Sequence, residues 1–392
     1  MLDRVAIVTL ALGVGSVVTR LLPAADAAQT LRRIVPLLLF LGAVIVLAEL
    51  TAKAEVFDVV ATRAAIAASG SFLALFLLSA AFAAATAMFL NLDTTAVLLT
   101  PVMLALAEKV DVPGAPLAMT TVWLANTASL LLPVSNLTNL LAADRVHLSA
   151  ARFAGRMLIP QLAAIAATAG CLWILHWRRG RRGGGRHRYD PPVPHTPGDT
   201  VLFAVAAAAC GVFVVLVLAG VPLALSSLAC AGAVVVAFWL RAPHELGWRL
   251  LPWRLLVFVT GLFLVVQTVS RYGLGTLVRG VIGQDAGPVG VVRAAGTGAA
   301  LSNVLNNLPA YVAGEAAVPL AHGQQLIGLL IGTNVGPIVT PWASLATLLW
   351  YERCRASDTQ VPWRRFVVTG AVTATCVLVA AVCGLLVSND FQ

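Results

Sequence analysis

The chain has 392 residues, of which 59% are hydrophobic and only 11% are charged, and its mean hydropathy is +0.91. Soluble domains carry about 25% charged residues, so this composition excludes a water-exposed globule. The net charge of +9 does not indicate nucleic-acid binding. Its basic residues cluster in one hydrophilic gap and at the ends of apolar segments, as they do in membrane proteins whose topology they set.

The apolar segments come next, in chain order. Five of them are long enough to cross a bilayer core of about 30 Å, namely residues 5–22, 34–50, 201–219, 255–269 and 366–387. The first is expected to be a retained span rather than a cleaved signal sequence, because no small-residue cleavage site leads into a soluble domain. The sequence therefore predicts an all-α polytopic membrane protein.

One hydrophilic linker divides the chain. Residues 178–199 are rich in Arg, Gly and Pro, which predicts a first membrane repeat at 1–177 and a second at 200–392. By the positive-inside rule the linker is cytoplasmic, in a multi-pass protein of the cell's inner membrane. Its arginines are Arg178, Arg179, Arg181, Arg182, Arg186 and Arg188. In contrast, Arg145, Arg152 and Arg156 fall on the outer side if the spans alternate strictly.

The two halves resemble each other. The segment from Leu38 aligns without gaps with the segment from Leu256, and the stretch from Asn126 aligns with the stretch from Asn334. The second alignment also pairs Pro133 with Pro341 and Asn136 with Ser344. The second half has one extra span, at 221–240 or next to it.

Polar and helix-breaking residues interrupt the apolar segments at four places, two in each half. They read "FLNLDTTAVLLTP" (89–101), "NTASLLLPVSNLTNLL" (126–141), "LSNVLNNLPAYVAG" (301–314) and "GTNVGPIVTPWASLATLLW" (332–350). Unwound backbone is tolerated in a bilayer only where it is buried in protein or lines a wet cavity. Matched interruptions in two halves indicate a transporter's substrate site near the midplane. The alternative is that these residues serve helix packing and kinks.

Two carboxylates are candidates for proton coupling. Asp93 lies in an apolar stretch of the first half, where an ionisable residue often marks a proton pathway and burial favours the protonated form. It can equally cap the helix that begins at Thr94. Glu315 follows the third interruption. It is either a second proton carrier or a residue at the boundary of the apolar segment. The chain has no metal-ligand spacing and no phosphate-binding loop, so we expect no metal and no cofactor.

At these four motifs the chain resembles the ArsB-type arsenite/antimonite efflux pumps. They belong to the ion transporter superfamily, with sodium/dicarboxylate carriers and certain sodium/proton antiporters. The resemblance implies two inverted-topology repeats, each with a re-entrant hairpin and an unwound transmembrane helix. It also implies a homodimer, an elevator-like movement, proton-coupled export of a trivalent oxyacid and, in some members, a separate soluble ATPase.

The resemblance also implies a set of substrate-binding residues. Those at the hairpin tips are Asn91, Thr94 and Thr95, with Asp93 as the proton carrier, and Asn303, Asn306 and Asn307. Those on the unwound helices are Asn126, Thr127, Ser129, Ser135 and Asn136, and Thr333, Asn334, Thr340 and Ser344.

The sequence thus predicts a secondary transporter, not an enzyme, that exports arsenite or antimonite in exchange for protons and confers arsenical resistance. A sodium-coupled carrier of a dicarboxylate or other small anion is the alternative, as is a sodium/proton antiporter. Asp93 counts against an anion, because it places a negative charge at the first tip. Arsenical pumps often carry an acid and a lysine where this chain has Asn334 and Ile338, which leaves both H⁺ and Na⁺ open as the coupling ion.

Overall fold

The computed structural model describes residues 2–178 and 187–389. Apart from one isolated bridge between Ser71 and Arg188, the regular elements in these two ranges are helices. Four linker arginines, Arg179, Arg181, Arg182 and Arg186, lie outside the described residues.

The α-helices of the first half precede the linker. They are α1 (Leu2–Val18), α2 (Ala24–Lys53), α3 (Val56–Ala67), α4 (Phe72–Leu90), α5 (Leu92–Thr94), α6 (Thr100–Lys109), α7 (Gly114–Thr127), α8 (Leu137–Arg145) and α9 (Ala150–Leu172). A π-helical turn, Thr95–Leu99, joins α5 to α6, and another, Trp173–Trp177, extends α9.

The α-helices of the second half follow the linker. They are α10 (Thr200–Leu218), α11 (Leu223–Arg241), α12 (Trp253–Val269), α13 (Gly275–Ile282), α14 (Pro288–Leu305), α15 (Asn307–Ala317), α16 (Gly323–Val335), α17 (Leu345–Ala356) and α18 (Trp363–Asn389).

Seven helices in the described part of the chain are long and apolar enough to cross a membrane: α2, α4, α9, α10, α11, α12 and α18. They include four of the five predicted spans. The first predicted span is shorter than expected, because α1 ends at Val18 and the chain turns at Arg20, whose φ is 61°. The prediction of an all-helical, multi-pass membrane protein is confirmed.

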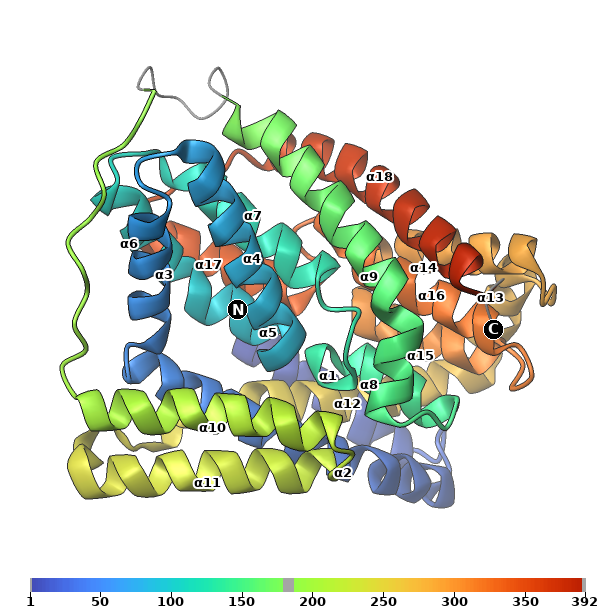
Figure 1. The fold of residues 1–392 in the computed structure, drawn as a ribbon. Helices are drawn as coiled ribbons and strands as arrows, with labels where there is room; N and C mark the ends of the chain where they lie inside the picture. The colour runs from blue at the N-terminus through green and yellow to red at the C-terminus, as the bar shows by residue number, and fades with distance from the viewer. Residues whose placement is uncertain (1, 179–186, 390–392) are drawn as a thin grey trace.

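The long helices pack in pairs that join distant parts of the sequence. Helix α1 packs on α12, and α11 packs on both α2 and α10. In Figure 1, α10 and α11 run along the lower edge of the molecule, and α9 and α18 lie side by side along the upper edge. Helix α14 packs on α16, and α4 packs on α7.

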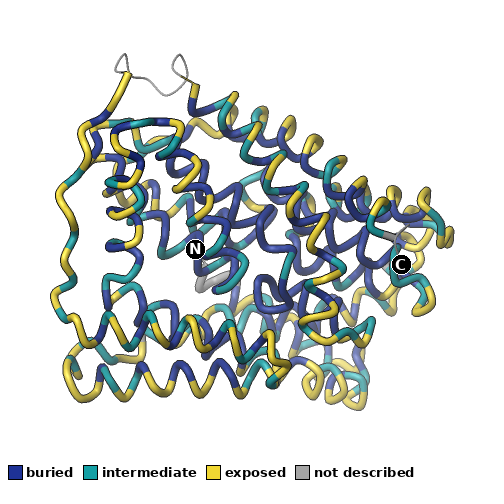
Figure 2. Tube along the Cα trace, in the orientation of Figure 1, coloured by how far each residue is buried: buried dark blue, intermediate teal, exposed yellow. Residues whose placement is uncertain are grey.

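Helices α7 and α16 occupy the middle of the molecule. Every residue of α7 from Pro116 to Thr127 is buried, and so is every residue of α16 from Gln325 to Val335. Figure 2 shows this buried centre in dark blue, surrounded by exposed outer helices. The polar residues at the ends of α7 and α16 therefore face other protein segments rather than lipid.

The contact between α14 and α16 depends on a glycine. A Cβ atom added to Gly332 would lie 2.0 Å from the carbonyl oxygen of Ala295. We expect Gly332→Ala to lower the free energy of unfolding by about 2–3 kcal/mol, because the two backbones must separate. Gly296→Ala on α14 is the matched control, since an added Cβ there meets nothing within 4 Å. Equal melting temperatures of the two purified variants would contradict this packing argument.

The described end of the linker, residues 187–199, crosses the left side of Figure 1. The hydroxyl of Tyr189 donates to the carbonyl of Ala65 at 2.6 Å, and His195 Nε2 lies 2.6 Å from Glu55 Oε2. Asp199 caps α10 and pairs with Arg241. The hydrogen bond from Arg241 is the main cause that holds the pKa of Asp199 below its usual range, and hydrogen bonds from the first N–H groups of α10 lower it further. The linker thus runs along α3, from the turn after it, where the N–H of Tyr189 donates to the Gly70 carbonyl, to Glu55 before it, and then reaches the start of α10.

Candidate substrate-binding site

Two turns with the same unusual backbone separate α4 from α5 and α14 from α15. Asn91 has φ 110° and ψ 150°, and Asn306 has φ 88° and ψ 153°. This combination of positive φ with ψ near 150° is essentially restricted to glycine, so contacts with the surrounding structure must hold both asparagines in it. The side-chain oxygen of Asn91 accepts from the N–H of Asp93 at 2.8 Å, and Asn306 Nδ2 donates to the carbonyl of Trp342 at 3.0 Å. These turns, called the first and second tips below, make Asn91 the counterpart of Asn306.

The chain is unwound between α7 and α8, and again between α16 and α17. Leu132 is extended, as expected for a residue before proline. Asn136 then caps α8 by accepting from the N–H of Thr138 at 3.2 Å, and Ser344 caps α17 by accepting from the N–H of Thr347 at 3.1 Å. Asn136 and Ser344 therefore occupy the same cap position in the two halves.

Asn334, at the end of α16, connects the second half to the first. Its side-chain oxygen accepts from Asn136 Nδ2 at 3.0 Å and from the Thr138 hydroxyl at 2.7 Å, and its Nδ2 donates to Asn139 Oδ1 at 2.8 Å. Asn139 Nδ2 in turn donates to the carbonyls of Ser129 and Leu132. Because Asn334 is only 1% exposed, these bonds form without competition from bulk water.

Asn126, at the end of α7, makes the corresponding but weaker contact. Its Nδ2 donates to the carbonyl of Val122 at 2.9 Å and lies 3.4 Å from the Thr347 hydroxyl of α17. Its buried side-chain oxygen has no hydrogen-bond partner among the described residues, and neither has the buried hydroxyl of Thr94. Buried polar groups are normally paired, so these two oxygens are candidates for contact with a solute.

Each tip is attached to the unwound stretch of its own half. Ser135 donates its hydroxyl proton to the carbonyl of Met88, near the first tip, at 2.6 Å. Asn303 Nδ2 donates to the Gly336 carbonyl at 2.9 Å, and its oxygen accepts from the N–H and the hydroxyl of Thr340. Tip and unwound stretch thus form one unit in each half.

A cavity of about 30 Å³, called the central cavity below, lies where these units meet α2 and α12. This volume holds about two water molecules. Its polar lining residues are Asp93, Asn136, Asn306 and Asn307, and its apolar lining residues are Leu41, Leu92, Leu137, Leu255, Phe258, Val259, Leu308 and Leu345. Asp93 is the only ionisable side chain among them, and none of the six cysteines is present.

The predicted binding residues therefore fall into groups. Those that line the central cavity are Asp93, Asn136, Asn306 and Asn307. Those that hydrogen-bond the tips and unwound stretches into place are Asn91, Thr95, Asn126, Ser135, Asn303, Asn334, Thr340 and Ser344. Thr127, Ser129 and Thr333 donate to carbonyls of their own segment, at Trp123, Asn126 and Leu330.

Glu315 lies away from the central cavity, on α15. It is 3% exposed, and its carboxylate accepts from the Arg33 guanidinium of α2 at 2.8 Å. Arg33 also lies 3.5 Å from Asp144 of α8. This ion-pair group joins α2 to α8 and α15.

Sequence reasoning missed Thr138, Asn139, Gln161 and Thr347. Gln161 on α9 accepts from the N–H of Leu130 at 2.7 Å and donates to the carbonyl of Thr127 at 3.1 Å. It thereby pairs backbone groups that the break after α7 leaves without helical partners. The available signal was an amide beside Pro160 in the apolar part of this helix, residues 157–172.

Comparison with known proteins agrees with this architecture. A family model described as a citrate transporter matches residues 1–347. The arsenical pump membrane protein of Yersinia enterocolitica is 31% identical over 325 residues, covering 77% of this chain and 74% of that protein. The arsenical pump membrane protein of Escherichia coli K12 is 30% identical over 331 residues, covering 79% and 76%.

A solved structure shares the fold. The YdaH transporter of Alcanivorax borkumensis superposes with a TM-score of 0.56 at 14% sequence identity, covering 95% of this chain and 90% of that one. The chain belongs to the citrate transporter family, and it is a membrane transporter, not an enzyme, related to the arsenical pump membrane proteins.

Proposed function

We propose that this protein exports arsenite and antimonite in exchange for protons. The observation that carries the proposal is the central cavity, in whose described lining one carboxylate, Asp93, is accompanied by neutral amides and apolar side chains. Arsenous acid is neutral near pH 7 and small, and it offers hydroxyl groups to such amides. The arsenical pumps among the relatives support the same substrate.

The lining of the cavity disfavours an anionic substrate. A dicarboxylate brings at least two negative charges, and among the described lining residues there is no Arg, Lys or His to balance them. Like charges that are close together in a low-dielectric site repel strongly. A neutral oxyacid avoids this cost.

We propose that the chain consists of two inverted-topology repeats with re-entrant tips, and that transport is a movement of these tips. Three features support it: the tips at Asn91 and Asn306 share one backbone conformation, Asn136 and Ser344 share one cap position, and α1 packs on α12 as α11 packs on α2. By this pairing α11 corresponds to α1, and α10 is the extra span. An elevator movement would carry the tips past α2 and α12, which form the opposite wall of the cavity.

Transport into inverted membrane vesicles tests this function. With an acidic lumen we expect arsenite to accumulate inside the vesicles, and a protonophore should abolish the accumulation. A sodium gradient alone should drive neither arsenite nor succinate. Vesicles that contain the Asp93→Asn protein provide the matched control for leakage and adsorption.

A sodium-coupled carrier of citrate or another small carboxylate is the second candidate. The match to the citrate transporter family model favours it, and Asp93 could bind a cation together with backbone carbonyls at the ends of the broken helices. Accumulation of citrate or succinate under a sodium gradient, without arsenite transport, would establish this function. Sodium accumulation in the vesicles, driven by the acidic lumen alone, would instead indicate a sodium/proton antiporter.

Glu315 offers a test of which carboxylate carries protons. We expect Glu315→Gln to retain proton-driven transport and to lose about 1–2 kcal/mol of stability, since one charged hydrogen bond to Arg33 is weakened. Arg33 keeps Asp144 as a partner, which limits the cost. Vesicle transport and thermal melting measure the two effects. Loss of proton coupling in this variant would instead make Glu315 a second proton carrier.

The assembly proposed is a homodimer in the inner membrane with a cytoplasmic linker. The resemblance to arsenical pumps implies this dimer. Some members of that group also associate with a separate soluble ATPase, which is therefore a second proposed partner. Cross-linking in native membranes and co-purification test these partners.

A further inference from the structure

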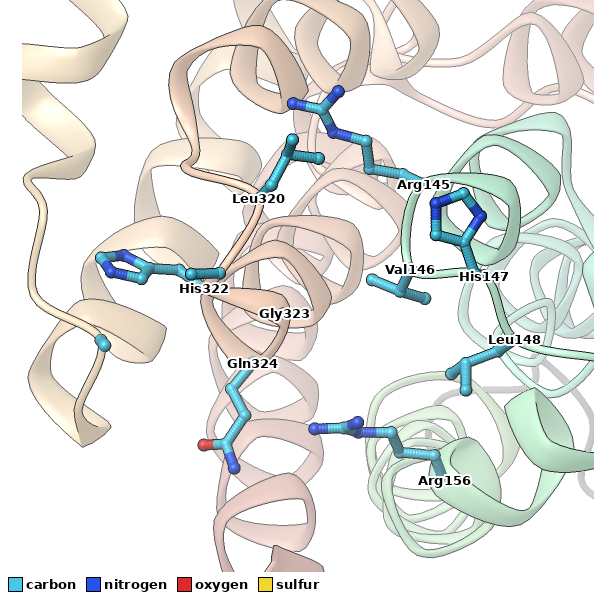
Figure 3. A pocket seen from close by; sticks show the side chains of 11 residues that line it. Arg145, Val146, His147, Leu148, Arg156, Leu320, His322, Gly323 and Gln324 are labelled. Carbon is cyan, nitrogen blue, oxygen red and sulfur yellow. The ribbon is translucent and has the colours of Figure 1, made fainter.

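A second, larger pocket lies at the end of α9 opposite the linker. It has a volume of about 670 Å³ and is bounded by the loop between α8 and α9 and by the loop between α15 and α16. Figure 3 shows Arg145 and Arg156 reaching from the α8–α9 side into the space between these loops. We call it the outer pocket; besides these two arginines, its lining includes His147, Leu320, His322 and Gln324.

The chemistry of the outer pocket suits an anion. No acidic side chain is among the described residues that line it. The Nε of Arg156 is buried and has no hydrogen-bond partner among the described residues. Helix α16 begins at Gly323, and its free N–H groups and positive dipole end add to the two guanidinium groups. Two carboxylates adjoin the lining in sequence: Asp144 pairs with Arg33, and Asp285 accepts from the N–H of Gly287. Arg145 also interacts electrostatically with the buried Glu315, which Arg33 pairs directly.

Arg156 is near the end of α9 that begins at Ala150. It lies six residues after that start, or about 9 Å along the helix, and a long arginine side chain near a helix end can extend to the polar headgroup zone of a bilayer. The next turn of α9 exposes Leu158, Ile159 and Leu162, as a lipid-facing surface does. A phosphate held at Arg156 could therefore have its acyl chains along these residues.

We propose that the outer pocket binds the phosphate group of an anionic phospholipid. Arg145 and Arg156 contact the phosphate, and the exposed leucines of α9 contact its acyl chains. Since the walls come from α8 and α9 of one half and from the α15–α16 loop of the other, a bound lipid ties the halves together. This explains why Arg145 and Arg156 lie on the side where the positive-inside rule predicts few arginines.

Purified full-length protein tests the proposal with phosphatidylglycerol, phosphatidylcholine and inorganic phosphate as separate probes. We expect phosphatidylglycerol to raise the melting temperature and to remain bound in native mass spectra, and the other two to have little effect. Arg145→Gln and Arg156→Gln should each weaken lipid binding about tenfold or more, because each removes a charged hydrogen bond. Arg152→Gln is the matched control, since Arg152 is exposed on the same helix and does not line the pocket.

Two outcomes would overturn the proposal. Equal retention of phosphatidylglycerol by the Arg156→Gln and Arg152→Gln proteins would place the lipid elsewhere. Equal protection by inorganic phosphate would assign the pocket to a free oxyanion instead of a lipid. If Arg156→Gln does not fold, Arg156→Lys keeps the positive charge and should retain the lipid, and Arg145→Gln remains as the test of loss.

Discussion

The Asp93→Asn variant should lose proton-driven arsenite accumulation completely while keeping its fold. Asn has nearly the shape of a protonated Asp, so it preserves the neutral state of the central cavity but cannot release a proton. Since Asp93 is the only ionisable side chain among the described residues that line this cavity, no neighbouring lining group can replace it. Vesicle uptake under a pH gradient measures the loss, and thermal melting of the purified protein checks the fold.

Glu108→Gln is the matched control for this experiment. Glu108 lies on α6, in the same helical hairpin as Asp93, but it is exposed and does not line the cavity. It should transport like the original protein. Movement of arsenite down its own gradient is a second measurement on the Asp93→Asn protein. The neutral side chain at position 93 of this variant cannot carry a proton, but it can still permit this movement. Undiminished proton-coupled uptake by Asp93→Asn would remove this residue from the mechanism.

Asn334→Ala should have the largest effect on stability, about 2–4 kcal/mol. It removes the hydrogen bonds to Asn136, Thr138 and Asn139, and it leaves their polar groups buried without partners. We expect transport to be lost as a consequence, because Asn136, which caps α8 and lines the cavity, is no longer held in place. Denaturant or thermal unfolding in detergent measures the change.

Asn126→Ala gives the matched comparison, since Asn126 occupies the corresponding place in the first half. Its contact across the halves is a single long bond of 3.4 Å to Thr347, so its removal should cost only about 1 kcal/mol. Its unpaired side-chain oxygen is a candidate contact for arsenite. The substitution should therefore lower the free energy of arsenite binding by more than it lowers the free energy of unfolding. An equal loss of stability in both variants would show that the two asparagines have the same structural role.

A double substitution separates the contribution of one pair within this network. If the bond between Asn334 and Asn139 accounts for part of the cost, the double variant Asn334→Ala/Asn139→Ala should be less destabilised than the sum of the single variants. Strict additivity would show that the two side chains are not coupled.

Membrane class and the positions of the breaks could be read from the sequence. Long apolar runs have few alternatives to a spanning helix, and the breaks have local causes. Pro133 forces the residue before it into an extended conformation. The turns at Asn91 and Asn306 combine positive φ with ψ near 150°, a conformation that is essentially restricted to glycine, so the sequence marked these polar interruptions but not their backbone conformation. The cap positions of Asn136 and Ser344 follow from the same local chemistry.

Only the tertiary structure decided which of the polar side chains meet one another and which line the cavity. Asn334 and Asn136 are 198 residues apart, and Arg33 and Glu315 are 282 apart, so no local pattern pairs them. The packing of α16 against α7 and α8 directs Asn334 toward Asn136, the N-cap residue of α8, whereas Asp93 lines the cavity. Local backbone preference therefore determines where this chain bends, whereas the burial of whole helices against one another determines what each bend faces.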